Sequence, residues 1–189
     1  VFDGRLSHYC ETDEPGPVLE YGRSKLAGEA AARDVLLDRA VVVRLALLYG
    51  WGLSQASRRR SFAARMLAEA KRGRSVWLFA DQFRSPLYVE DAALGMVLIL
   101  RTPRVPPLLH LGGPERLSRH QIGLAALEVF GLDPALAKAT SMRDVPSRAA
   151  RPVDVSLDIR RARRLGFDPR GVRQGFEAMR RLFPCPQGE

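Results

Sequence analysis

The sequence has few cysteines and no long hydrophobic run. Only Cys10 and Cys185 occur among the 189 residues, and their spacing fits neither a metal site nor a disulfide framework. The longest apolar segments, Ala40–Leu48 and Gly95–Leu100, are far shorter than the roughly 20 residues that a membrane-spanning helix requires. No signal-peptide pattern opens the chain. These absences predict a cytoplasmic protein with free thiols, no metal site and no membrane contact.

Lysine is rare although the chain is strongly basic. The net charge is +9, yet Lys25, Lys71 and Lys138 are the only lysines. A basic chain can bind nucleic acid, because neutralised phosphates release counterions. Here the arginines are spread along the sequence, apart from clusters at Arg58–Arg60 and Arg160–Arg164, and no known nucleic-acid-binding motif accompanies them. We therefore favour solvated surface charge or a cleft for a phosphate-bearing small molecule, with no nucleic-acid partner.

Hydrophobic periodicity alternates between helix and strand. Leu19–Asp38 has apolar residues at helical spacing, whereas Val41–Leu48 is short, β-branched and apolar on both faces, which is typical of a parallel strand. Ser118 and Gly131 are suited to cap the two ends of one helix. Further helices are expected over 62–71, 91–101, 118–130, 158–165 and 171–182, and strands over 76–79 and 108–111. The alternation predicts an α/β fold with a parallel sheet.

Tyr21 and Lys25 form the most informative pair in the sequence. Four residues apart on a helix, they share one face near its first turn. The ammonium and the helix N-terminus both favour the phenolate, which would lower the tyrosine pKa from about 10 toward neutrality. Such a phenol can protonate a carbonyl oxygen while hydride reaches the carbon. The alternative is a surface Tyr and Lys that share this spacing by chance.

Further motifs follow in a fixed order along nearly the whole chain. They are Val1–Gly4, Tyr9, Glu11, Asp13, Pro15–Pro17, Tyr21–Glu29, Arg44–Gly50, Asp81-Gln82, Ser85-Pro86, Val89, Asp91-Ala92, Leu109–Gly113, Arg151-Pro152 and Leu157-Asp158. Together they resemble the dTDP-4-dehydrorhamnose reductase family of extended short-chain dehydrogenases. The resemblance implies the C-terminal part of a Rossmann-type doubly wound parallel sheet with a smaller mixed α/β substrate-binding lobe. Residues 1–50 would belong to the dinucleotide-binding domain, and residues 51–189 mainly to the sugar-nucleotide lobe, with some returns to the sheet.

The same resemblance implies NAD(P)H-dependent reduction of a nucleotide-activated 4-keto-sugar. Tyr21 would be the general acid, and Lys25 would lower its pKa and hold the nicotinamide ribose. The remaining implied contacts are Ala46 and Leu48 for the cofactor, NADP or NAD, and Leu47, Gln82 and Arg84 for the substrate. Asp91 and Arg151 also match family positions, where helix capping and lobe packing are expected. The resemblance leaves open the sugar, the nucleotide and the oligomeric state, a homodimer included.

Several features depart from the family pattern. The Ser or Thr that completes the catalytic triad would precede Val1, and no glycine-rich turn of a dinucleotide-binding βαβ unit occurs. We therefore expect a fragment that is inactive alone and binds NAD(P)H weakly or not at all. Leu47 replaces the aromatic residue of the reductases, and Arg84 and Leu87 replace the usual Gly and Thr. These changes weaken the assignment of dTDP-4-keto-rhamnose as the substrate more than they weaken the assignment of the fold.

Three other functions are compatible with parts of the sequence. One is a non-catalytic regulatory or sugar-nucleotide-binding subunit, like the regulatory β subunit of methionine adenosyltransferase, which also has an aliphatic residue at the position of Leu47. Another is a nucleotide-sugar epimerase, because the Tyr/Lys pair serves both reactions. The third, a nucleic-acid-binding module, is suggested by charge alone.

Overall fold

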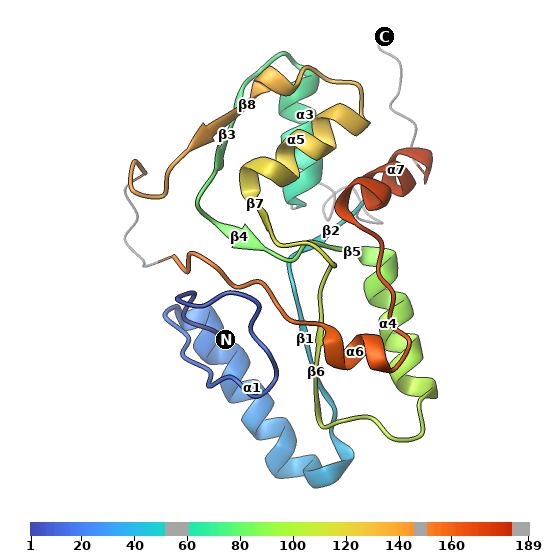
Figure 1. Ribbon diagram of the computed structural model, residues 1–189. Helices are drawn as coiled ribbons and strands as arrows, with labels where there is room; N and C mark the ends of the chain where they lie inside the picture. The colour runs from blue at the N-terminus through green and yellow to red at the C-terminus, as the bar shows by residue number, and fades with distance from the viewer. Residues whose placement is uncertain (52–60, 146–150, 183–189) are drawn as a thin grey trace.

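The computed structural model describes residues 1–51, 61–145 and 151–182, so Cys185 and the cluster Arg58–Arg60 lie outside the described residues. Figure 1 shows two groups of elements, one above the other. We call residues 1–46, 89–111 and 151–167 the sheet region. We call residues 61–79, 117–140 and 172–182 the lobe.

The sheet region holds one pair of parallel strands and three α-helices. Its elements are α1 (Glu20–Leu36), η1 (Leu37–Arg39), β1 (Val42–Leu45), α4 (Val89–Arg101), β6 (Leu108–Leu111) and α6 (Arg160–Arg164). β1 and β6 pair in parallel, with Val42 opposite Leu108 and Leu45 opposite Leu111. α4 packs on this sheet through Ala92 and Ile99, which join Leu111 in one apolar cluster. The pairing of β1 with β6 joins segments that are far apart in the sequence.

The lobe also contains a parallel strand pair, covered by helices. Its elements are α3 (Phe62–Lys71), β3 (Val76–Phe79), β7 (Leu117–Ser118), α5 (Arg119–Val129), η2 (Pro134–Leu136), β8 (Ala137–Thr140) and α7 (Val172–Leu182). β3 and β8 are parallel, and α5 packs against both α3 and α7 (Figure 1). Ser118 caps α5 in a capping box with Gln121, and Gly131 follows with φ of 67°. The α/β fold with parallel pairing is therefore confirmed.

Short strands connect the two regions. They are β2 (Leu48–Tyr49), β4 (Phe83–Arg84) and β5 (Leu87–Tyr88). The single strand expected over 41–48 is divided, because the chain changes partners. Ala46 N donates to Leu111 O of β6 at 2.9 Å, and Leu47 O accepts from Leu87 N of β5 at 2.8 Å. β2 and β5 are parallel, whereas β4 and β7 are antiparallel. The proposed domain boundary near residue 50 stays a prediction.

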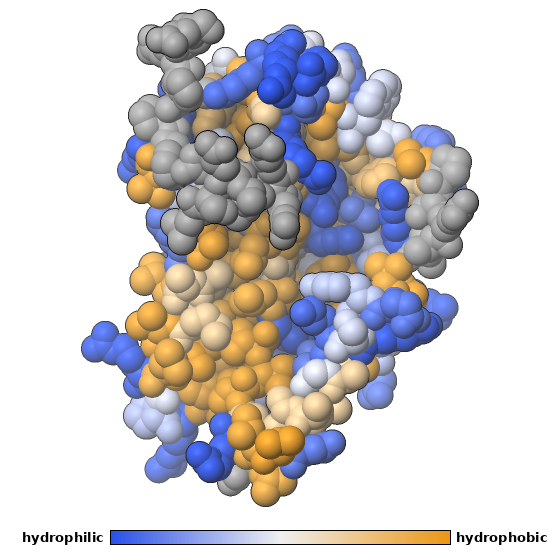
Figure 2. Space-filling view, turned by 180° about the vertical axis from the view of Figure 1, so that it is seen from behind, coloured by the Kyte–Doolittle hydropathy of each residue, from blue (hydrophilic) through white to orange (hydrophobic). Residues whose placement is uncertain are grey.

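A broad apolar surface lies on the face turned away from the viewer in Figure 1. Figure 2 shows it toward the lower left, over α4 and the neighbouring sheet. The exposed apolar side chains of α4 include Leu94, Met96, Val97 and Leu100. Among the described residues, no helix is both long enough and apolar enough to cross a bilayer.

Candidate active site

A cleft of about 1000 Å³ receives side chains from both regions. Its walls include one face of α1, the end of β1, the loop from 79 to 84 and the N-terminus of α5. Among its lining residues are Tyr21, Lys25, Glu29, Arg44, Ala46, Leu47, Gln82, Arg84, Arg119 and Arg151. Six of the seven residues that the sequence singles out thus meet in one cavity. Leu48 is the exception.

Tyr21 and Lys25 project from the first two turns of α1. The Lys25 Nζ lies 5.4 Å from the centre of the Tyr21 ring, which is within the range of a cation–π contact. The Tyr21 side chain is 71% exposed, so its phenol is open to a bound molecule. The helical spacing brings the pair together as predicted. Its catalytic role stays a prediction.

The end of β1 forms the wall next to α1. Ala46 and Leu47 line the cleft, and both are partly buried. Leu48 pairs with Leu87 of β5 and is 41% exposed. Successive side chains of an extended chain point to opposite sides, so Leu48 points away from the side that Leu47 faces. Cofactor contact by Leu48 therefore remains a prediction without support from the cleft.

Gln82, Arg84 and Arg119 form a crowded polar group across the cleft. Gln82 is buried, and its Oε1 accepts a hydrogen bond from Arg119 Nε at 3.4 Å. Arg84 donates to three backbone oxygens, those of Phe83, Pro152 and Val153. Burial and the neighbouring Arg119 guanidinium lower the pKa of Arg84 to about 10, and burial also lowers that of Arg119. Both arginines stay charged at neutral pH, so this wall is positive.

Arg119 is the residue of this group that the sequence pattern did not identify. It occupies the first position of α5, and the first turn of this helix has no acidic residue. A cation at the positive end of a helix is unfavourable without a nearby anion. An arginine at this position could therefore have been recognised from the sequence as a candidate anion-binding residue. Its Nη1 is buried with no hydrogen-bond partner among the described residues.

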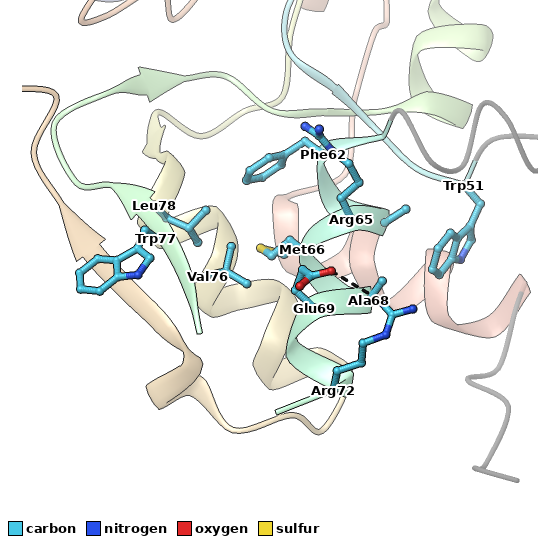
Figure 3. A pocket seen from close by; sticks show the side chains of 11 residues that line it. Trp51, Phe62, Arg65, Met66, Ala68, Glu69, Arg72, Val76, Trp77 and Leu78 are labelled. Carbon is cyan, nitrogen blue, oxygen red and sulfur yellow. Dashed lines mark hydrogen bonds and ion pairs between the residues drawn. The ribbon is translucent and has the colours of Figure 1, made fainter. Parts of the chain in front are cut away.

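A second hollow of about 730 Å³ adjoins the cleft. Figure 3 shows Phe62 and Arg65 of α3 and Trp77 and Leu78 of β3 around it, and these four residues also line the cleft. The hollow is mostly apolar, with Trp77 69% exposed. It extends the binding surface beyond the arginine wall. Neither the hollow nor its aromatic residues were predicted.

Comparison with known proteins decides the family. Residues 1–183 match the family described as RmlD substrate binding domain. The chain belongs to this family. A probable low-salt glycan biosynthesis reductase of Haloferax volcanii is 36% identical over 160 residues, 84% of this chain and 52% of the relative. A dTDP-4-dehydrorhamnose reductase of Mycolicibacterium smegmatis is 33% identical over 165 residues, 87% of this chain and 49% of the relative. The chain spans about half the length of these RmlD relatives.

Two further similarities bear on fold and function. The crystal structure of a dTDP-4-dehydrorhamnose reductase from Clostridium acetobutylicum aligns over 98% of this chain and 63% of its own, with a TM-score of 0.84 and 23% identity. That likeness establishes the Rossmann-type RmlD fold. The methionine adenosyltransferase 2 subunit beta of Bos taurus is 28% identical over 176 residues, 90% of this chain and 51% of the relative.

The RmlD fold implies a nicotinamide cofactor, and part of the cleft fits one. The exposed phenol of Tyr21 and the ammonium of Lys25 can donate hydrogen bonds to a ribose. Ala46 is small enough to let a flat ring approach the end of β1. The sequence offers no glycine-rich turn for the cofactor pyrophosphate. Among the described residues, no group of three or more His, Cys, Asp and Glu side chains could hold a metal ion.

Proposed function

We propose that the protein carrying this chain reduces a nucleotide-activated 4-keto-sugar with NAD(P)H, as a dTDP-4-dehydrorhamnose reductase does. The observation that carries the proposal is that the Tyr21–Lys25 pair and a wall of arginines line the same cleft. An acid for the keto oxygen and cations for a diphosphate are the two requirements of this substrate. Relatives named as dTDP-sugar reductases support the same reaction.

Tyr21 acts as the general acid in this proposal. Its phenol donates its proton to the keto oxygen of the sugar, and the carbonyl becomes a hydroxyl. The Lys25 ammonium beside the ring stabilises the negative charge that the phenol oxygen acquires. When bound, the reduced nicotinamide supplies the hydride. Tyr21, Lys25 and Ala46 would hold its nicotinamide end.

The arginine wall binds the diphosphate of the nucleotide. The Arg119 guanidinium stacks on the Phe62 ring at 4.6 Å, and that of Arg151 on the Phe79 ring at 5.3 Å. Stacking covers the faces of a guanidinium and leaves its N–H groups free in the plane, where a phosphate oxygen binds. A diphosphate would also relieve the repulsion between Arg84 and Arg119. The apolar hollow next to Arg65 and Trp77 would take the base.

Substitution of Tyr21 tests the reaction. In the full-length protein, Tyr21→Phe should lower kcat for a dTDP-4-keto-6-deoxy-sugar by about 10²–10⁴-fold, because general acid catalysis contributes that much. Turnover is followed by the loss of NAD(P)H absorbance. Tyr49→Phe is the matched control, since Tyr49 lies outside the lining of the cleft and its buried hydroxyl donates to Val172 O at 3.2 Å. It should leave kcat unchanged. Equal turnover by wild type and Tyr21→Phe would refute the acid role.

A regulatory subunit is the second candidate, favoured by Leu47 and by the similarity to methionine adenosyltransferase 2 subunit beta. Purification of the full-length protein with a stoichiometric enzyme partner, together with no turnover of any nucleotide keto-sugar, would select this function. Interconversion of two nucleotide sugars without net oxidation of cofactor would select an epimerase instead.

A further inference from the structure

α1 carries the proposed acid but has little apolar attachment to the rest of the chain. It is 17 residues long, and Gly22 is its only buried residue. Val35 near its C-terminal end is 79% exposed. Apolar packing alone therefore does not fix how this helix is rotated about its axis.

One buried ion pair connects α1 to strand β1. Arg44 Nε donates to Glu29 Oε1 at 2.9 Å, and Arg44 Nη2 donates to Glu29 Oε2 at 2.7 Å. The side chains are 8% and 10% exposed, in that order. The Arg44 guanidinium also lies 5.1 Å from the centre of the Phe2 ring. A bidentate pair of this kind fixes the direction of both side chains as well as their distance.

The two residues of the pair adjoin the predicted catalytic and cofactor-binding positions. Glu29 lies four residues after Lys25, which lies four after Tyr21, so the three side chains form one stripe on α1. Arg44 precedes Ala46 by two residues on the strand. All five residues line the cleft. A rotation of α1 that breaks the Glu29–Arg44 contact would therefore also move Tyr21 relative to the wall formed by Ala46.

We propose that Glu29 and Arg44 are positioning residues, which set the orientation of Tyr21 and Lys25 toward the end of β1. The ion pair with Arg44 also keeps the Glu29 carboxylate away from Lys25. Without Arg44, Glu29 would be free to pair with the ammonium one turn before it and draw that ammonium from the tyrosine. The effect on catalysis rests on the proposed function. The effect on the orientation of α1 does not.

A role in stability alone is the competing explanation. Buried ion pairs contribute little net stability, because the desolvation of two charges offsets their attraction, and their better-attested use is to fix one arrangement. The two explanations differ in what they predict for turnover. A merely structural pair would change unfolding and leave the kinetics of the folded enzyme as they are.

Amide hydrogen exchange on the full-length protein tests the orientation without any substrate. Glu29→Gln keeps the size of the side chain and removes its charge. Exchange in α1 should become about 10-fold faster or more, with α5 unchanged, because local opening depends on few contacts. Glu20→Gln is the matched control on the same helix, since Glu20 pairs with Arg23 at an exposed site. It should leave exchange in α1 at the wild-type rate. Equal protection of α1 in all three proteins would overturn the proposal.

Steady-state kinetics test the link to catalysis. Glu29→Gln and Arg44→Lys should each lower kcat by about 10–100-fold with KM for the nucleotide sugar within about twofold, because small misplacements of a reacting group are costly. Arg44→Lys keeps the positive charge but loses the planar fork, so it separates geometry from charge if Glu29→Gln folds poorly. The double variant Glu29→Gln/Arg44→Lys should be no slower than either single one.

The outcomes separate the two proposals. Wild-type kcat in Arg44→Lys, while Tyr21→Phe is inactive, overturns the positioning role and leaves the reductase. No turnover by the wild type, or full turnover by Tyr21→Phe, overturns the reductase. The hydrogen exchange of α1 then still decides whether the pair orients this helix.

Discussion

The lobe buries its helices against one another, whereas the sheet region leaves its longest described helix, α1, almost uncovered. In the lobe, Phe176 and Met179 of α7 and Leu127 of α5 are all fully buried in one apolar cluster. In α1 only Gly22 is buried. The lobe helices are thus held by an apolar core, whereas α1, which carries Tyr21, is not.

Buried charged and polar contacts add to the apolar clusters of the sheet region. Besides the Glu29–Arg44 pair, Glu11 is 4% exposed and lies 3.6 Å from Arg161. The Glu11 carboxylate also accepts from the His110 backbone N–H at 3.1 Å. Such contacts are directional, while apolar burial is not. The comparison indicates that the sheet region depends on directional charged contacts more than the lobe does, so it should respond to conditions that leave the lobe unchanged.

The largest expected difference in stability comes from apolar truncation. Phe176→Ala should destabilise the protein by about 3–5 kcal/mol, because it removes a fully buried ring from the lobe. Val35→Ala on α1 is the counterpart and should change the free energy of unfolding by less than about 0.5 kcal/mol. Urea unfolding measures both. Similar losses of unfolding free energy in the two variants would show that α1 is packed as firmly as the lobe, which would contradict the difference between the two regions.

Local signals in the sequence account for the elements that were predicted well. α3 begins and ends where its apolar spacing does, at Phe62 and Lys71. Ser118 before α5 and Gly131 after it act as caps. These features depend on neighbours within a few residues of the chain, so the sequence contains them directly. The Tyr21–Lys25 contact belongs to the same class, because helix geometry alone produces it.

Features that depend on distant segments were not predictable in the same way. The two-residue strands β4 and β7 pair through Phe83 and Ser118. Both are too short to show the alternating hydrophobic pattern from which a strand is predicted. Glu29 and Arg44 meet only because α1 folds back along β1. The position of Arg119 in the cleft depends on how the lobe packs. The family resemblance supplied Arg84 as an expected substrate contact, but it did not supply Arg119.

Acid should destabilise the sheet region before the lobe, through His110. Burial lowers the pKa of His110 below its usual 6.5, against the opposing charge of Glu11 and with the support of Arg44 and Arg161. Its Nδ1 lies 3.0 Å from Tyr9 O, and its Nε2 has no partner among the described residues. The neutral ring is therefore the folded form.

The sign of the pH effect follows from this neutral ring. The unfolded chain binds a proton at His110 as pH falls through about 6.5, and the folded chain does not, so stability is lost below that pH. The slope approaches about 1.4 kcal/mol per pH unit. Unfolding between pH 7 and 5 measures it, with His110→Gln expected to flatten the slope and the exposed His8→Asn expected to keep it. An unchanged slope in His110→Gln would assign the acid sensitivity to other groups.

The smallest expected effect compares the serine that precedes α5 with a serine inside α1. Ser118 Oγ accepts from Gln121 N at 3.1 Å in the lobe, whereas Ser24 Oγ donates to Tyr21 O at 2.9 Å on exposed α1. Ser118→Ala should cost about 1 kcal/mol, the usual value of an N-cap, and Ser24→Ala less than about 0.5 kcal/mol. Chemical denaturation resolves that difference when the slopes of the two transitions agree. Because α5 packs against both α3 and α7, loss of its cap should destabilise the whole lobe. An equal loss of unfolding free energy in Ser24→Ala would mean that α1 unfolds together with the lobe.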